Sequence, residues 1–451
     1  MKIAIIGAGY VGLTSGAVFS YIGHDVSVIE VDGRKVEMLR SGECPFHEPH
    51  LKDLLSAAPS LKFATEYEGV ANADAIFLAV GTPQSSDLRP DMSYLRAAVQ
   101  KVGERLGSRP AVVVNKSTVP VGSGQWVEGV LRESARSSKE FSGNRLFVAS
   151  NPEFLREGSA VHDALYPDRI VLGTDSPATL DVLCRIYAPI IAQSFRPPAF
   201  LPRPDGVGRV PVLNTSRQAA ELIKYAANSF LALKISFINE IARLAEAVGA
   251  DILDVARGVG LDNRIGGQFL QAGIGWGGSC FSKDTAALLA SARERGIAMP
   301  IVEAARSVNE QQRELAVQKL FSELKTLQGR TIGLLGLAFK ENTDDLRDAP
   351  ALEIARRLVS LGANVRAHDP AALTNARKEL RDIEITLCEA AGAAAKDADA
   401  LVLVTPWPEY RDISWRDVAT IMRQPLIVDT RNYLSREMVQ RHGFRYLGIG
   451  R

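Results

Sequence analysis

The sequence predicts an α/β protein with two doubly wound parallel-sheet domains joined by a long central helix. Short apolar runs alternate with helical segments in both the first and the last third of the chain, which is typical of buried parallel strands. A glycine-rich turn directly follows the first of these runs. Between the two α/β regions, apolar residues recur at helical spacing from Asn214 to Val248, which indicates one long amphipathic helix.

The first domain opens on the apolar run Lys2–Ile6, followed by Gly7-Ala8-Gly9-Tyr10-Val11-Gly12. A helical segment and a second strand, His24–Glu30, come next. Strand, glycine turn, helix, strand and terminal acid form the dinucleotide-binding fingerprint of a Rossmann-like domain. The glycines permit close approach of a pyrophosphate, and Glu30 would bind the ribose and repel a 2′-phosphate. We therefore expect NAD as cofactor, although nearby Arg34 leaves NADP open.

Other apolar strands of the first domain also end in polar loops. They are Ala75–Val80 before Gly81-Thr82-Pro83, Ala111–Asn115 before Lys116-Ser117-Thr118, and Phe147–Ser150 before Asn151-Pro152-Glu153. Ligands of an open parallel sheet bind beyond the carboxyl ends of its strands, so these loops are expected to line a site. The segment 44–50, CPFHEPH, has metal-binding residue types. It lacks the repeated spacing of a zinc site and a second ligand cluster, so we predict no metal.

Composition restricts the classes of partner. The 451 residues carry a net charge of +1, which argues against nucleic acid or an anionic membrane. No apolar run approaches the ~20 residues of a membrane span, and because the sequence opens with a predicted strand we expect no export signal. The four scattered cysteines then fit a reducing cytoplasm.

The central region follows a connector rich in Pro, Gly and Arg. Its helix can be capped by Asn214 or Thr215 and should stop at Gly249. Lys224 and Asn228 are four residues apart on it, so they share one face. By pattern alone the simpler interpretation is an ordinary surface lysine and an ordinary surface asparagine.

The stretch Gly273–Asp284, GIGWGGSCFSKD, is where we place the chemistry. Its four glycines let the backbone approach a ligand closely. Cys280 lies where this loop meets a helix, and the helix dipole together with Lys283 favours the thiolate. Asp284 lies about one helical turn further on and could exchange a proton with the thiol. A glycine-rich turn with a structural cysteine is the alternative.

A second α/β unit begins near Thr331, with strands expected at Thr331–Leu335, Ala363–Ala367, Ala400–Thr405 and Leu426–Asp429. It has no complete GxGxxG motif, so we expect it to bind a ligand other than a second NAD. The expected domains are 1–205 for NAD, 206–315 for the central helical region with the cysteine loop, and 316–451 for the second Rossmann-like domain.

The ordered motifs GAGYVG, GTP, KSTVPVG, NPEFLREG, ELIKYAANSFLALKISFINE, RIG, GWGGSCFSKD, GLAFKENTDDLRD and DTRN cover essentially the whole chain. This set resembles the UDP-glucose/GDP-mannose dehydrogenase family. The resemblance implies NAD-dependent oxidation of a UDP-glucose C6 alcohol to the carboxylate, a homodimer built on the central helix, and a UDP-binding C-terminal domain. Departures from the usual family pattern are Trp276, Ser282, Glu30 in place of Asp, and a longer stretch at 196–209.

The resemblance also assigns roles to residues. Cys280 matches the nucleophile, surrounded by the polar groups Thr118, Glu153, Lys224, Asn228 and Asp284. Cofactor contacts are expected at Gly7, Gly9, Tyr10, Val11, Gly12, Glu30, Lys35, Thr82, Thr118, Glu157, Lys283 and Arg347. Substrate contacts are expected at Phe154, Leu155, Arg156, Lys224, Asn228, Arg264, Phe269, Leu270, Gly273, Gly277, Phe281 and Lys340, with Arg264 reaching into the neighbouring subunit.

Other activities remain open. A relative could oxidise GDP-mannose or an N-acetylated UDP-hexosamine, but Gly278-Ser279-Cys280 differs from the GGHC of hexosamine enzymes. Phe281-Ser282 likewise differs from the Leu-Pro of GDP-mannose enzymes. A hydroxyacid dehydrogenase would need neither Cys280 nor the second α/β unit. A non-catalytic NAD-binding protein would have no reason to keep the thiol with Lys224, Asn228 and Asp284.

Overall fold

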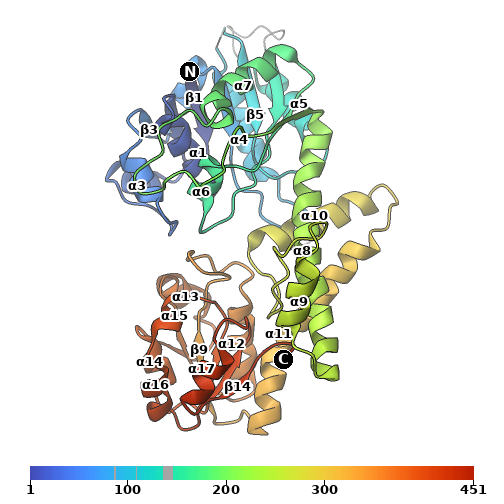
Figure 1. Cartoon of the computed structure of the whole chain (residues 1–451). Coiled ribbons are helices and arrows are strands. Elements are labelled where there is room, and N and C mark those ends of the chain that lie inside the picture. The colour runs from blue at the N-terminus through green and yellow to red at the C-terminus, as the bar shows by residue number, and fades with distance from the viewer. Residues whose placement is uncertain (86–87, 108, 136–145) are drawn as a thin grey trace. The chain divides into compact units, whose positions relative to one another are not determined.

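The computed structural model describes residues 1–85, 88–107, 109–135 and 146–451 and confirms the α/β class (Figure 1). The chain divides into two compact units, Met1–Ala227 with Ala286–Arg295, and Asn228–Thr285 with Gly296–Arg451. Each unit is described separately. No helix within these described residues has both the length and the apolar character needed to cross a bilayer.

The first unit is built on a sheet with strand order β3-β2-β1-β4-β5-β6-β7-β8. All neighbouring strands are parallel except β6 and β7, which pair antiparallel at Ser150 and Gly173. The order reverses direction between β1 and β4, and this switch point is where such sheets bind ligands. The strands are β1 (Lys2–Ile6), β2 (Asp25–Ile29), β3 (Leu61–Ala64), β4 (Ala75–Leu78), β5 (Ala111–Asn115), β6 (Leu146–Ser150), β7 (Ile170–Gly173) and β8 (Val212–Thr215).

Helices cover both faces of this sheet, so its strands are apolar on both sides. Leu13, Leu54, Leu165 and Ile186 are among the side chains that form the core on one face. They belong to α1 (Tyr10–Tyr21), α3 (Leu51–Ser56), α6 (Ala160–Leu165) and α7 (Pro177–Ile191). The other face is covered by the 3-10 helix η1 (Tyr67–Asn72), α4 (Ser93–Arg105) and α5 (Ser123–Ala135). The short helix α2 (Gly33–Arg40) follows β2.

The Pro- and Arg-rich stretch 196–209, to which the sequence assigned no role, lies against the α1, α6 and α7 side of the first unit. The Tyr21 hydroxyl donates to Arg196 O at 3.0 Å, and the Tyr166 hydroxyl donates to Leu201 O at 2.9 Å. Phe200 stacks on His50, with 5.8 Å between the ring centroids. The stretch therefore covers the core with apolar side chains and leads into the edge strand β8.

Glu48 gives the segment 44–50 a structural role. Its buried carboxylate accepts from Gly158 N at 2.7 Å and Ala160 N at 2.8 Å. A carboxylate at this position neutralises the free N–H groups at the start of α6. In the described residues, no three His, Cys, Asp or Glu side chains gather as a metal site would require.

The second unit contains a six-stranded, all-parallel sheet of order β11-β10-β9-β12-β13-β14, the same winding as the first six strands of the first sheet. The strands are β9 (Thr331–Leu335), β10 (Asn364–His368), β11 (Ile385–Leu387), β12 (Ala400–Leu403), β13 (Leu426–Asp429) and β14 (Arg445–Leu447). The helices are α9 (Ile252–Gly260), α11 (Pro300–Leu324), α12 (Pro350–Ser360), α13 (Leu373–Glu379), α14 (Ala391–Ala395), α15 (Glu409–Asp412), α16 (Trp415–Ile421) and α17 (Arg436–Arg441). Two further helices, α8 (Arg217–Val248) and α10 (Ser279–Arg293), each contribute residues to both units.

Helix α8 is 32 residues long, which corresponds to about 48 Å at the usual rise. The capping hydroxyl belongs to Ser216, which accepts from Ala219 N at 3.2 Å. Asn214 and Thr215, the expected caps, lie in β8 instead. The helix ends at Gly249, whose φ of 75° favours glycine.

Candidate functional site

The glycine turn between β1 and α1 leaves no room for side chains at two positions. Gly7 has a φ of 104°, and a Cβ there would lie 2.7 Å from Ala79 O. A Cβ on Gly12 would lie 2.0 Å from Gly7 O. By contrast, a Cβ on Gly9 would meet nothing within 4 Å. The turn is therefore tight on its protein side and open at Gly9, which precedes the first residue of α1.

Glu30 holds this turn from the end of β2. Its carboxylate accepts from Ala8 N at 3.0 Å and from Asp32 N at 3.1 Å. Two carboxylate oxygens offer about four acceptor positions, so capacity remains for ribose hydroxyls. A tight glycine turn, an open helix N-terminus and this acid fit a dinucleotide such as NAD.

Five other expected cofactor residues also belong to the first unit. The Thr82 hydroxyl donates to Thr118 O at 2.7 Å, so the loops after β4 and β5 are joined. Tyr10 packs on Phe46 with ring centroids 3.9 Å apart. Lys35 lies in α2, and Glu157 lies in the loop between β6 and α6.

A buried ion pair joins α8 to the loop after β6. Lys224 Nζ lies 2.9 Å from Glu153 Oε1, and the two side chains are only 5% and 7% exposed. Burial alone would raise the pKa of the Glu153 carboxyl. The charge and hydrogen bond of Lys224, the Leu155 N–H at 2.6 Å and the charge of Lys116 reverse this effect and lower that pKa. Glu153 is therefore ionised at neutral pH.

Phe154 lies beside this pair and contacts two cations. The guanidinium of Arg169 lies 3.6 Å from its ring centroid, and the Lys224 ammonium lies 5.5 Å from it. Such contacts are favourable by about 0.5–2 kcal/mol. The aromatic ring thus helps to fix the lysine next to Glu153.

A second polar group lies in the second unit, around the start of α10. Cys280 is the second residue of this helix, and the fully buried Asp284 follows one turn later. Asn228 Nδ2 donates to Asp284 Oδ2 at 2.7 Å, and Lys283 Nζ lies 3.0 Å from Asp284 Oδ1. The structure therefore brings together four residues that the sequence singled out.

The loop before Cys280 is held by amide side chains that sequence reasoning missed. Asn309 of α11 accepts from Trp276 N at 2.7 Å and donates to Trp276 O at 2.9 Å. Asn239 accepts from Gly273 N at 2.8 Å, and Gln312 donates to Gly273 O at 2.8 Å. These four bonds fix the loop backbone at both ends of the sequence GIGW. Nothing local marks such residues, because they lie far away along the chain.

Side-chain contacts also restrain this loop. Trp276 Nε1 donates to Ser236 Oγ at 3.1 Å, and Phe281 packs edge-on against Trp276 at 6.0 Å. A Cβ on Gly277 would lie 2.4 Å from Asp348 O, so this position requires glycine. Leu270 is buried in the small core formed with α8 and α9, and Phe269 beside it has a φ of 64°.

Asp369 is the counterpart of Glu30 in the second sheet. At the end of β10 it occupies the position that Glu30 has after β2, and it accepts from Leu337 N at 2.7 Å and Ala338 N at 2.9 Å. It also accepts from Trp407 Nε1 at 3.1 Å. Asp369 is fully buried, so it cannot present an acid to a ribose.

Lys340 follows directly after this turn, and its ammonium lies 5.7 Å from the Phe339 ring. It is therefore placed at the carboxyl edge of the second sheet, where ligands of such sheets bind. Three expected arginines are held by neighbouring acids, Arg156 by Asp163, Arg264 by Asp262 and Arg347 by Asp345, with the closest atoms 2.6 Å apart in each pair.

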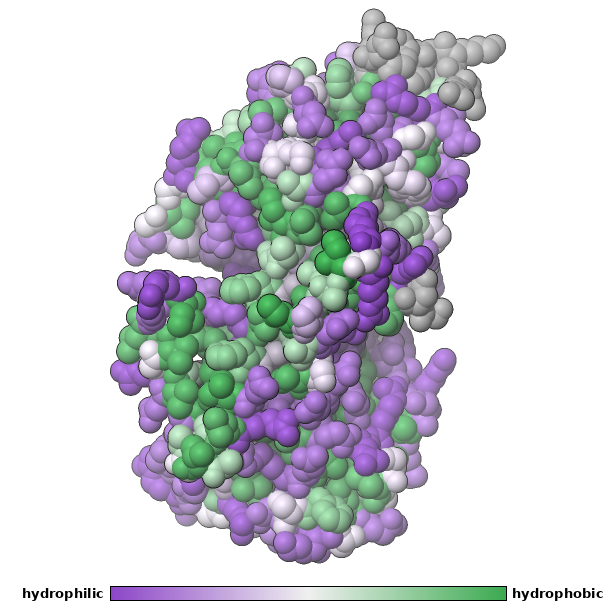
Figure 2. Space-filling model, turned by 90° about the vertical axis from the view of Figure 1, so that its right-hand side faces the viewer, coloured by the Kyte–Doolittle hydropathy of each residue, from purple (hydrophilic) through white to green (hydrophobic). Residues whose placement is uncertain are grey.

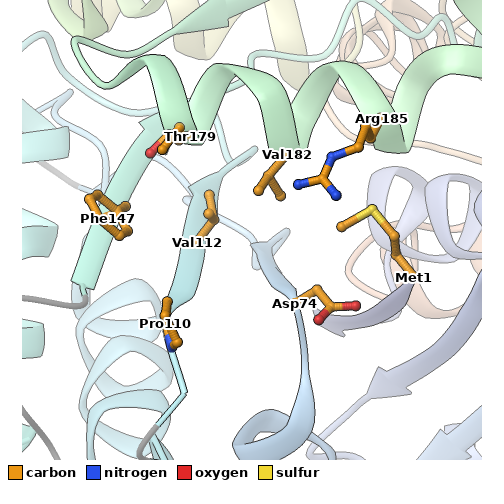
Figure 3. Close-up of a pocket in the computed structure, with 9 residues that line it drawn as sticks. Met1, Asp74, Pro110, Val112, Phe147, Thr179, Val182 and Arg185 are labelled. Carbon is orange, nitrogen blue, oxygen red and sulfur yellow. The ribbon is translucent and has the colours of Figure 1, made fainter.

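A cavity of about 280 Å³ lies at the opposite, amino edge of the first sheet (Figure 3). Its rim includes Met1 before β1, Asp74 before β4 and Pro110 before β5. Apolar side chains form much of its lining, and its two charged side chains already pair elsewhere, Asp74 with Arg109 and Arg185 with Asp181. Because the polar loops lie at the other strand ends, this cavity is separate from the candidate site.

Three family models match the chain in order. They are the NAD binding domain of the UDP-glucose/GDP-mannose dehydrogenase family at residues 1–191, the central domain of the same family at 218–311, and its UDP binding domain at 333–436. Together they span most of the sequence.

Individual proteins are similar over the full length. UDP-glucose 6-dehydrogenase TuaD of Bacillus subtilis is 43% identical, with 100% of this chain and 93% of the relative covered. UDP-glucose 6-dehydrogenase of Pseudomonas aeruginosa is 44% identical, with 100% and 98% covered. The solved structure of a UDP-glucose dehydrogenase from Pyrobaculum islandicum is 39% identical, with a TM-score of 0.87 over 99% of this chain and 97% of that one.

Proposed function

The chain belongs to the UDP-glucose/GDP-mannose dehydrogenase family and is an NAD-dependent oxidoreductase, and we propose that it converts UDP-glucose to UDP-glucuronate through Cys280. The observation that best supports this role of Cys280 is the arrangement of side chains at the start of α10. A thiol in the first turn is followed one turn later by a fully buried carboxylate that Asn228 and Lys283 hold.

A second hydride can leave C6 only when that carbon also carries a hydroxyl or alkoxide, which the aldehyde lacks, so we propose that the reaction passes through a covalent adduct. Oxidation of the C6 alcohol first gives the aldehyde, losing one hydride and one proton. The Cys280 thiolate then adds to this carbon and forms a thiohemiacetal. Loss of the second hydride gives a thioester, and water hydrolyses it to the carboxylate and the free thiol. When bound, NAD accepts the hydride in each oxidation.

The other residues would handle charge and protons. Lys224 and Asn228 lie one turn apart on α8, and both can donate to the oxygen that becomes negative at C6. Asp284, next to Cys280 on α10, would take up or return protons, and the ionised Glu153 would orient the hydrolytic water. Thr118 would contact both sugar and cofactor. Lys340 would bind the anionic UDP, as a lysine at the carboxyl edge of a sheet can.

Counting NADH against uronate tests this function. We expect two NADH per UDP-glucose consumed, and a lower kcat/KM with GDP-mannose and with UDP-N-acetylglucosamine. The measurement follows absorbance at 340 nm together with quantified sugar product. One NADH per sugar would instead indicate a simple alcohol dehydrogenase, and NAD binding without any NADH would indicate a non-catalytic protein.

We further propose that the protein is a homodimer built on α8. Leu222, Phe230, Phe237, Leu244 and Val248 are all exposed, Phe230 by 62% and Val248 by 69%. At 100° per residue they fall within roughly 80° of the helix circumference. Apolar side chains also gather in the middle of the face shown in Figure 2, in the region of α8 to α11. An apolar stripe of this kind marks an association surface.

Charge on this stripe should separate the subunits. We expect the double variant Phe237→Glu with Leu244→Glu to elute as a monomer of 48.8 kDa, whereas the unaltered protein should have twice this mass by light scattering. Ile421→Glu, at an exposed apolar residue of α16, is the matched control and should remain dimeric. A wild-type protein that is monomeric at micromolar concentration would refute the proposal.

A further inference from the structure

Lys116 carries a buried charge that the mechanism above does not use. It follows the last residue of β5 and is only 7% exposed. Its ammonium donates to Asn151 Oδ1 at 3.1 Å and to the Tyr187 hydroxyl at 3.3 Å. Asn151 and Tyr187 are themselves buried, so the ammonium lies in the interior of the first unit, beside the loop that carries Glu153.

The polar contacts around Lys116 would survive without it. The Tyr187 hydroxyl donates to Asn151 Oδ1 at 2.6 Å, and Asn151 Nδ2 donates to Val171 O in β7 at 2.9 Å. The asparagine thus joins β6 to β7 and remains hydrogen-bonded whatever residue replaces the lysine. The fold needs the amide and the phenol here, but it does not need a positive charge.

Burial of this charge is unfavourable. It lowers the pKa of Lys116 to about 8, an effect that the Glu153 carboxylate opposes and the Lys224 ammonium reinforces. An apolar side chain of similar length would avoid this cost, and such replacements of buried charges are often neutral or stabilising. Stability therefore gives no reason for a lysine at this position.

The charges that surround Lys116 do give a reason for a lysine at this position. Within the first unit, Lys116 and Lys224 act on the single carboxylate of Glu153. Arg169, over the Phe154 ring, interacts with the exposed carboxylate of Asp168 and with Glu153, whereas burial raises the pKa of Tyr187 and keeps it neutral. The positive charges in this group outnumber the negative ones, and in a low-dielectric interior such an excess acts strongly on nearby charge.

We propose that Lys116 is a positioning residue for the oxidation: its ammonium, bound to Asn151 two residues before Glu153, supplies excess positive charge next to the buried pair of Glu153 and Lys224, the lysine that meets the developing oxyanion. The proposal rests on the function proposed above. It assigns to Lys116 no contact with substrate or cofactor, because its ammonium is bound to Asn151 and Tyr187.

Lys116→Met tests the charge, and Tyr187→Phe is the matched control that retains it. We expect Lys116→Met to lower kcat about 10- to 100-fold, with KM for UDP-glucose and Kd for NAD within about threefold of wild type. Its Tm should be unchanged or higher. Tyr187→Phe should keep kcat within about threefold and lower Tm. A methionine variant with wild-type kcat, or with kcat and Tm reduced together, would overturn the proposal.

The pH dependence gives a readout that packing alone would not change. Because the folded pKa of Lys116 lies below the unfolded one, its unfavourable contribution is present below about pH 8 and vanishes toward pH 10.5. The stability advantage of Lys116→Met over wild type should therefore shrink across this window. The ratio of wild-type kcat to variant kcat should fall over the same range, because wild-type Lys116 loses its charge there. A ratio that does not change with pH would contradict the proposed role of Lys116.

A failure of the proposed function can be distinguished from a failure of the proposed role of Lys116. If wild-type protein produces no uronate, the proposed function fails, while the urea titrations of stability against pH still test the buried charge at Lys116. If Lys116→Met does not fold, Lys116→Gln replaces it, since glutamine can still donate to Asn151 Oδ1 but carries no charge. The expected loss in kcat and the pH behaviour are the same.

Discussion

Replacing Cys280 by serine is expected to abolish release of the uronate while leaving NAD binding intact. A serine hydroxyl is a far weaker nucleophile than a thiolate at neutral pH, so the aldehyde can no longer be captured on the enzyme. We expect uronate formation to fall by at least about 10³-fold, which corresponds to about 4 kcal/mol of barrier. Quantified uronate, NADH per sugar and titrated NAD affinity together measure the result.

Cys184→Ser provides the matched control for this experiment. Both cysteines are partly buried, and Cys184 lies in α7 of the first unit. Burial raises the pKa of the Cys184 thiol, so it should react slowly with iodoacetamide. The control should retain wild-type kcat. Uronate production by Cys280→Ser at the wild-type rate would remove the covalent mechanism altogether.

The dinucleotide-binding motif could be recognised from sequence because it is confined to a short stretch of chain. Gly7, Gly12 and Glu30 are recognisable because the turn, the helix and the acid follow one another within one unit of strand, helix and strand. Asn228 and Asp284 could be paired only through the family motifs that contain them, and the structure places them 2.7 Å apart. The fold class, the family and the cofactor were predicted correctly on this basis.

Residues whose roles depend on tertiary packing escaped prediction. Lys116 looked like an ordinary polar residue at a strand end, because its partners come from the loop after β6 and from α7. Asp369 could have been noticed, since it ends the second strand of its domain just as Glu30 does. The edge strands β3, β8, β11 and β14 are short, with three or four residues, and too short for a clear periodicity.

Breaking the buried ion pair of Lys224 and Glu153 is expected to lower both the stability and the activity of the protein. Lys224→Met would leave the Glu153 carboxylate buried without its main partner, at a cost of about 3–5 kcal/mol in the free energy of unfolding at pH 7. Loss of a donor to the oxyanion should also lower kcat by about 10²- to 10³-fold. Urea denaturation and steady-state kinetics measure the two effects separately.

The double variant Lys224→Met with Glu153→Gln separates the role of the charge in folding from its role in the reaction. In wild type the pKa of Glu153 is lowered, so its contribution to stability is present above the unfolded pKa of 4.5 and is lost as pH falls. In Lys224→Met we expect that pKa to rise above 4.5, so the stability deficit should shrink as pH falls from 7 toward 5. The double variant should regain stability at pH 7 because no buried carboxylate is left without Lys224, yet its kcat should stay low. Recovery of kcat along with stability would mean that the pair serves the fold alone.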